Sequence, residues 1–182
     1  MAKDAAYWIE TLRLEEHPEG GFFKRTYAAG EEIRHEHLPE RFSGPRTFSS
    51  AIYYLLPGDR TSTFHRLKSD EMWHFYAGSP LILFILDKEG RLQIKRLGND
   101  PAKGEAFQHW IEAGDWFGAM VSDPGSYSLV GCTVAPGFDY ADFELADPEE
   151  LLELYPQHRV LIAHLCRSNA PPDDGSTQEP AL

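Results

Sequence analysis

The 182-residue sequence has little positive charge, two cysteines and no long apolar segment, and each scarcity excludes a class of protein. With 17 Lys and Arg against 29 Asp and Glu, its net charge is −12, and it has no basic cluster to neutralise the phosphates of a nucleic acid. Cys132 and Cys166 are too few for a disulfide framework and show no C-x-x-C spacing, so we expect both to be small buried side chains.

The apolar segments are too short for a membrane protein. The longest run, 81–86, cannot cross a bilayer, and residues 1–16 contain no apolar stretch typical of a secretory signal. We therefore expect a cytoplasmic protein without a membrane or nucleic-acid partner.

What the sequence does contain is a series of short segments rich in Ile, Val, Phe, Tyr and Thr, separated by turns rich in Gly, Pro, Asp and Ser. The chain becomes extended at 22–27, and the later predicted strands are 47–56, 61–67, 71–77, 81–87, 91–97, 106–112, 116–121, 126–135 and 139–144. No helical pattern lies between consecutive strands, which argues against βαβ units. The pattern is typical of an antiparallel sandwich or barrel, an all-β fold.

Short helices are predicted at both ends of this series. Residues 4–14 carry apolar side chains at helical spacing behind Asp4 as the N-cap. Asp147 has the pattern of a second helix start, and 158–166 is predicted to form a third helix. The length fits one domain over 1–167, followed by a polar, Pro-rich tail over 168–182 that we expect to be disordered.

The strongest chemical signal lies in 58–78. If 61–67 and 71–77 pair as a hairpin, His65 and Glu71 lie together on the concave face of the sheet, beside Trp73. An imidazole next to a carboxylate in an aromatic pocket can transfer protons or bind a ligand. The alternative is a core histidine with an ordinary carboxylate partner.

This segment also carries a family resemblance. It resembles the first motif of the cupin superfamily, G-x(5)-H-x-H-x(3,4)-E-x(6)-G. Closer similarity is to the branch called DUF985 or Cupin_5, through HPEGGFFKRTY (17–27), PRTFSSAIYYLL (45–56), FHRLKSDEMWHFYAGSPL (64–81) and SLVGCTVAPGFDYADFEL (128–145). The resemblance implies an RmlC-like double-stranded β-helix, a jelly roll with a pocket in its mouth, often dimeric. It implies no particular reaction.

The sequence departs from the metal-binding cupins. Those proteins use two His and a Glu from the first motif and a His from the second, whereas Leu67 replaces the second His here and 116–122 contains no ligating side chain. We therefore expect no metal and no cofactor. His74 points to the opposite strand face from Glu71, and a weak metal site that recruits His74 is an alternative.

A metal-free reaction fits the resemblance to sugar epimerases of the same fold. By that analogy His65 is the base beside Glu71, and a tyrosine returns the proton: Tyr127, with Tyr53 and Tyr54 as alternatives. This gives an isomerase or epimerase acting on a small polar ligand, sugar-like or anionic. The alternative is a non-catalytic module that binds or senses such a ligand.

Other side chains are candidates for substrate binding. Arg46 is the best candidate to anchor an anionic group, since a guanidinium binds carboxylates bidentately. Tyr53, Trp73 and Phe117 are candidates for an aromatic wall, although aromatic residues more often fill a core.

Two polar segments could also border the pocket. Glu19, Arg25 and Thr26 lie around the double glycine, but we favour a solvated surface position for them. Asp142 and Glu144 alternate with Phe143, which also favours solvation.

The segment 81–86 is apolar on both strand faces, so its outer face needs a cover. We expect a homodimer formed by sheet packing.

Overall fold

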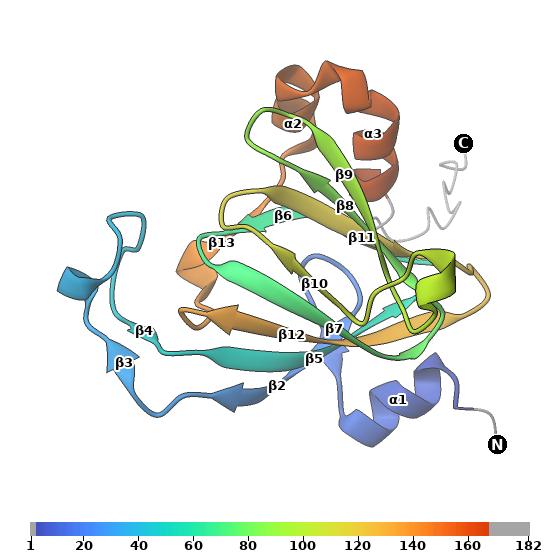
Figure 1. Ribbon diagram of the computed structural model, residues 1–182, viewed down its shortest axis with the longest axis horizontal. Coiled ribbons are helices and arrows are strands. Elements are labelled where there is room, and N and C mark those ends of the chain that lie inside the picture. The colour runs from blue at the N-terminus through green and yellow to red at the C-terminus, as the bar shows by residue number, and fades with distance from the viewer. Residues whose placement is uncertain (1–2, 168–182) are drawn as a thin grey trace, which may run out of the picture.

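The structure is a computed structural model that describes residues 3–167, and it consists of two antiparallel sheets packed face to face (Figure 1). Across the first sheet the strands are β1 (Glu15–Glu16), β2 (Phe22–Ala28), β5 (Ser50–Pro57), β12 (Tyr127–Ala135), β7 (Asp70–Gly78) and β10 (Gln108–Ile111). Across the second they are β13 (Phe143–Leu145), β6 (Thr61–Leu67), β11 (Trp116–Val121), β8 (Leu81–Leu86) and β9 (Leu92–Leu97). The predicted all-β class is confirmed.

A smaller ribbon projects from one end of the sheets (Figure 1). It pairs β3 (Glu32–Ile33) with β4 (Arg46–Thr47). Four short 3-10 turns complete the described elements: His35–His37, Pro101–Lys103, Tyr140–Asp142 and Pro156–His158.

The predicted hairpin of 61–67 with 71–77 is wrong. β6 lies in the five-stranded sheet, between β13 and β11, whereas β7 lies in the six-stranded sheet, between β12 and β10. The chain therefore crosses from one sheet to the other at 68–69. Because both strands turn alternate side chains inward, residues of β6 and β7 still face a common interior.

Three helices cover the outer faces of the sheets (Figure 1). α1 (Ala5–Leu12) starts at Asp4, whose Oδ1 accepts a hydrogen bond from the Tyr7 amide at 2.9 Å, and it packs on the six-stranded sheet over Leu55 and Leu129. α2 (Pro148–Leu154) and α3 (Arg159–Arg167) cover the other sheet. None of the described helices is long and apolar enough to cross a membrane. The predicted disordered tail, 168–182, lies outside the described residues.

The structure explains the two-faced apolar character of β8 without a second chain. Leu81, Leu83 and Ile85 point into the core between the sheets. On the other face, Phe84 packs against a buried cluster that includes Ile162 of α3. Helices of the same chain thus supply the cover assigned above to a partner, so this argument for a homodimer is wrong, and the homodimer itself stays a prediction.

Candidate functional site

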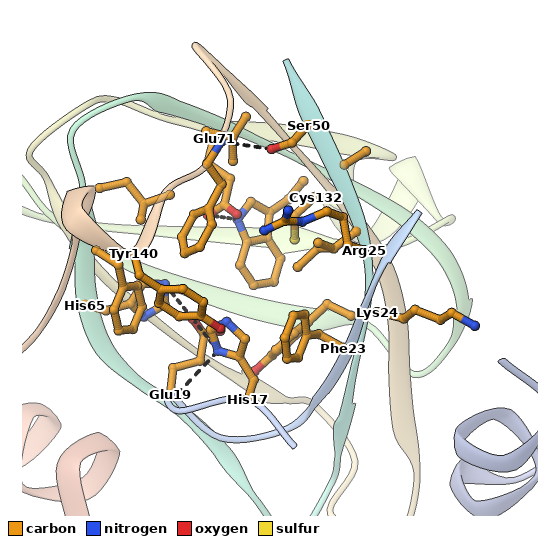
Figure 2. A pocket seen from close by; sticks show the side chains of 18 of the residues that line it. His17, Glu19, Phe23, Lys24, Arg25, Ser50, His65, Glu71, Cys132 and Tyr140 are labelled. Carbon is orange, nitrogen blue, oxygen red and sulfur yellow. Dashed lines mark hydrogen bonds and ion pairs between the residues drawn. The ribbon is translucent and has the colours of Figure 1, made fainter. Parts of the chain in front are cut away.

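A cavity of about 390 Å³ lies between the two sheets at one end of the fold (Figure 2). Its walls come from the inward residues of β2, β5, β6, β7 and β12, together with the loop before β2 and the segment 138–143. The cavity is at the small end of the usual range for sites that bind small molecules.

Strand register decides which side chains face this cavity. Phe23 and Arg25 of β2 pair with Tyr54 and Ile52 of β5, so their side chains share the inner face of the sheet. Lys24 also borders the cavity, but it is one position out of phase and its side chain extends away from the other lining residues (Figure 2). Arg25 borders the cavity and is also exposed, so the expectation of a solvated surface position agrees with the structure for both Arg25 and Thr26.

His65 lies on β6 at the bottom of the cavity, with 2% of its surface exposed, and its carboxylate partner is Glu19. Its Nε2 lies 3.0 Å from Oε2 of Glu19, and its Nδ1 lies 2.7 Å from the Thr63 carbonyl oxygen. A carbonyl oxygen only accepts hydrogen bonds, so Nδ1 carries a proton. Nε2 can contact the Glu19 carboxylate favourably only if a second proton lies between Nε2 and Oε2. The expected pairing of His65 with Glu71 is therefore replaced by a buried His65–Glu19 pair.

The electrostatics of this pair favour an imidazolium and a carboxylate. Burial alone would raise the pKa of Glu19, but the adjacent His65 and His17, with a hydrogen bond from Ser62, lower it to about 2. For His65, burial acts to lower the pKa. The Glu19 carboxylate raises that pKa by more than burial lowers it, so the pKa of His65 is raised overall. The pair is therefore charged near neutral pH, and Glu19, expected to be solvated, is 5% exposed.

His17 is the second histidine of this cluster, and sequence reasoning did not identify it. Its Nδ1 accepts a hydrogen bond from the Glu19 amide at 3.4 Å, and its ring packs edge-on against those of Phe23 and Phe143. Burial lowers its pKa, so His17 favours the neutral form. The only sequence signal for its role was its place in the family-like HPEGG segment.

The loop 17–21 is held in place from both sheets. The Thr63 amide of β6 donates to the Glu19 carbonyl at 2.8 Å, and the Tyr54 hydroxyl of β5 donates to the Gly20 carbonyl at 2.9 Å. Gly21 has φ +69°, and a Cβ there would lie 2.8 Å from the Leu55 carbonyl oxygen. This close approach requires glycine and explains the double glycine after Glu19.

Glu71 lies on β7 in the opposite wall and is 7% exposed. Its Oε2 accepts a hydrogen bond from Trp73 Nε1 at 2.9 Å. Burial, the largest cause, and repulsion from Glu19 raise its pKa, while His65 and the hydrogen bonds of Trp73 and Cys132 oppose the rise, leaving a pKa of about 7. Glu71 can therefore gain or lose a proton near neutral pH.

The aromatic candidates separate into different places. Trp73 lines the cavity. Phe117 lies behind His65, with ring centroids 4.1 Å apart, and packs the imidazole from the core side. Tyr53 faces outward against Tyr76, and the Tyr127 hydroxyl accepts a hydrogen bond from Trp8 Nε1 of α1 at 2.8 Å. Neither Tyr53 nor Tyr127 lines the cavity.

Arg46 is buried in a separate ion pair. Its Nε and second guanidinium nitrogen donate to the two carboxylate oxygens of Asp142 at 2.6 and 2.7 Å, and Arg46 does not line the cavity. The predicted anionic anchor therefore joins β4 to the turn before β13. The expectation that Asp142 is solvated is also wrong, since it is 5% exposed.

The cavity residues do not fit the metal set of the cupins. Leu67 lines the cavity with methyl groups, which donate no electron pair. His74 faces outward, hydrogen-bonded to Thr133 and Gln108. Among residues 3–167, no group of three or more His, Cys, Asp or Glu side chains is arranged to hold a metal ion.

The solved structures that are similar to this chain include two of similar length. A protein from Shewanella oneidensis is 40% identical, with a TM-score of 0.82, and the match covers 91% of this chain and 99% of that one. A hypothetical protein from Leishmania major is 33% identical, with a TM-score of 0.80 and coverage of 88% and 97%. Oxalate decarboxylase from Bacillus subtilis, 14% identical with a TM-score of 0.50 over 82% of this chain and 36% of that one, is similar in fold alone.

None of the curated proteins compared with the chain matches it. The sequence model of Cupin_5, described as "Cupin superfamily (DUF985)", matches residues 6–146. The chain therefore belongs to the Cupin_5 (DUF985) family and has the jelly-roll fold of the cupin superfamily.

Proposed function

We propose that the cavity binds a small organic ligand and that Glu71 exchanges a proton with it in a metal-independent isomerisation or epimerisation. The observation that carries this proposal is a carboxyl group in the cavity wall with a pKa of about 7. A general acid–base residue works best when its pKa is near the operating pH.

The proton-transfer role assigned to His65 from the sequence moves to Glu71. Both ring nitrogens of His65 are engaged, with Thr63 and Glu19, so no lone pair faces a ligand. The two partners of the His65–Glu19 pair act on Glu71 in opposite directions, since the His65 imidazolium lowers the pKa of Glu71 and the Glu19 carboxylate raises it.

The chemical step balances without an oxidant or reductant. The Glu71 carboxylate removes a proton from a carbon next to a carbonyl, and the electron pair of the C–H bond moves into an enolate. The Glu71 carboxylic acid then returns the proton to the opposite face of the same carbon after the enolate has turned over in the cavity. Alternatively, where that carbon carries a hydroxyl group, the hydroxyl proton passes to the enolate oxygen and Glu71 protonates the former carbonyl carbon. The first outcome is an epimerisation and the second an isomerisation.

Solvent deuterium exchange tests this function. We expect the protein in D2O to exchange carbon-bound hydrogen of a carbonyl compound, with fructose, pyruvate and phenylpyruvate as probes and mass spectrometry as the readout. Exchange above the buffer rate should fall by roughly 100-fold or more in Glu71→Gln. The exposed Glu112→Gln is the matched control.

A second candidate, a binding or sensing module, is favoured by the internal hydrogen bonds that already occupy most polar atoms of the cavity. If a probe raises the melting temperature without exchange, this second function holds. If exchange proceeds equally in Glu71→Gln, the acid–base role of Glu71 is wrong.

A further inference from the structure

One positively charged side chain enters the cavity without a carboxylate partner. Arg25 extends from β2 into the cavity (Figure 2), as its inward register position requires. Within residues 3–167, no carboxylate lies within ion-pair distance of it, whereas Arg46, Arg60, Arg66 and Arg91 all have one. A guanidinium in this position can bind a carboxylate through two parallel hydrogen bonds.

The other charges around the cavity do not cancel Arg25 directly. Glu19 is neutralised by its ion pair with His65. Lys24 points away, and Glu15 lies on the exposed edge strand β1. Glu71 lies in the buried wall and shares its carboxylate with Trp73.

Most polar atoms in the cavity are already engaged with the protein. The Tyr54 hydroxyl donates to Gly20, and the Ser50 hydroxyl accepts a hydrogen bond from the Phe138 amide at 2.9 Å. The Trp73 indole donates to Glu71, and both nitrogens of His65 are engaged. A sugar would have to bury several hydroxyl groups with few partners, and each unpaired group costs binding free energy.

The remaining surface suits a ring or a branched hydrocarbon. The side chains of Phe23, Ile52, Trp73, Phe138 and Phe143 line the cavity between its polar groups. Aromatic walls of this kind bind flat apolar groups through stacking and edge contacts.

We infer that the ligand is a small carboxylate with an apolar, ring-sized body, bound through its carboxylate by Arg25. This inference rests on the proposed function and narrows it from polar ligands in general to organic acids. The body of the ligand occupies the aromatic part of the cavity, where a carbon next to a carbonyl group can approach Glu71.

Three probes separate the contribution of the carboxylate from that of the apolar ring. Benzoate has both, its neutral analogue benzyl alcohol has only the ring, and the sugar acid glucuronate has a carboxylate on a polar body. Binding is followed by NMR through the indole N–H signal of Trp73, assigned with Trp73→Phe, because that indole lies in the cavity wall. We expect benzoate to bind at least about tenfold more tightly than either other probe. Arg25→Gln should lose at least about tenfold of the benzoate affinity, since it removes a charge-assisted contact.

Lys24→Gln is the matched control, because it removes an adjacent positive charge that extends away from the other lining residues (Figure 2). It should leave benzoate binding within twofold of the unmodified protein. Equal affinity for benzoate and benzyl alcohol, tighter binding of glucuronate, or full benzoate affinity in Arg25→Gln would overturn the inference and leave the proposed function in place. If none of the three probes shifts the Trp73 signal, the cavity does not bind small ligands, and both proposals fail.

Discussion

The imidazole of His65 and the carboxylate of Glu19 form a buried ion pair, with Nε2 and Oε2 3.0 Å apart. His65 comes from β6 and Glu19 from the loop before β2, so the pair joins the N-terminal loop to the five-stranded sheet. It favours the protonated form of His65, and the proposed proton exchange is for that reason assigned to Glu71.

Glu19→Gln should destabilise the fold by about 3 kcal/mol at pH 6, because it leaves a buried histidine without its counter-charge. The raised pKa of His65 stabilises the folded state fully below pH 6.5, the pKa of the unfolded state. This stabilisation is lost as the pH rises through the higher pKa of the folded state. The stabilisation from the lowered pKa of Glu19 is present above 4.5 and is lost as the pH falls to about 2. Urea denaturation at pH 6 measures the loss.

Glu16→Gln, on the exposed neighbouring strand β1, is the control for this change; it removes only an exposed ion pair with Arg60 and should alter stability by less than about 1 kcal/mol. In Glu19→Gln the pKa of His65, followed by NMR of its ring protons, should fall below 6.5. A histidine that titrates at the same pH in both proteins would contradict the ion pair.

The effect of Glu71→Gln on the free energy of unfolding should be more stabilising at pH 8 than at pH 5. Because the pKa of Glu71 is about 7 when folded and 4.5 when unfolded, the folded state holds an extra proton between these values, and stability falls as the pH rises through them. The difference amounts to roughly 3 kcal/mol at pH 8. Unfolding curves of both proteins at pH 5 and pH 8 give this value.

The charged groups that face Glu71 are His65 and Glu19, with the Cys132 thiol beside it and Arg25 entering the same cavity. All four are retained in Glu71→Gln, so subtracting the two pH profiles isolates the Glu71 carboxyl. Parallel profiles for the two proteins between pH 5 and 8 would show that Glu71 titrates normally.

Asp142→Asn should cost about 3 kcal/mol of stability, since it leaves the Arg46 guanidinium buried without its counter-charge. Glu144→Gln breaks the exposed pair with Arg66 nearby and should cost less than about 1 kcal/mol. Thermal and urea unfolding of the two variants compare a buried pair with an exposed one. Equal costs would mean that burial does not set the strength of these pairs.

Ile162→Ala should destabilise the fold by about 2–4 kcal/mol, because Ile162 is fully buried between α3 and the five-stranded sheet. Val160→Ala, on the same helix but 80% exposed, should change stability by less than about 0.5 kcal/mol. Binding of a hydrophobic dye to Ile162→Ala would report a loosened helix above Phe84. Two variants of equal stability would mean that α3 does not seal this sheet.

The strands could be predicted because their signals are local. Apolar segments between Gly and Pro turns predicted strands at 61–67 and 116–121. The structure has β6 at Thr61–Leu67 and β11 at Trp116–Val121, so both ends of both strands were predicted correctly. The pairing of strands is not local, so the sequence was misread as placing β6 and β7 in one hairpin. The segment 139–144 was also misread, since a 3-10 turn over Tyr140–Asp142 precedes a strand of three residues.

The site was predicted only where strand alternation applies. Alternation correctly placed His65, Glu71 and Trp73 on inward faces. It carries no information on loops, so Glu19 and His17 were missed as partners of His65. Arg46 was chosen for its chemistry alone, and its burial against Asp142 depends on a contact between residues far apart in the sequence.

The loop 17–21 is attached to Tyr54 on one sheet and to Thr63 on the other, and it therefore bridges the two sheets at this end of the fold. Under the proposed function, we expect a relative with a bulkier ligand to have a longer or differently anchored loop here, because larger strand side chains would only narrow the cavity. If relatives bind ligands of different size, the length and sequence of this loop should change with ligand size more than the sequence of any strand does.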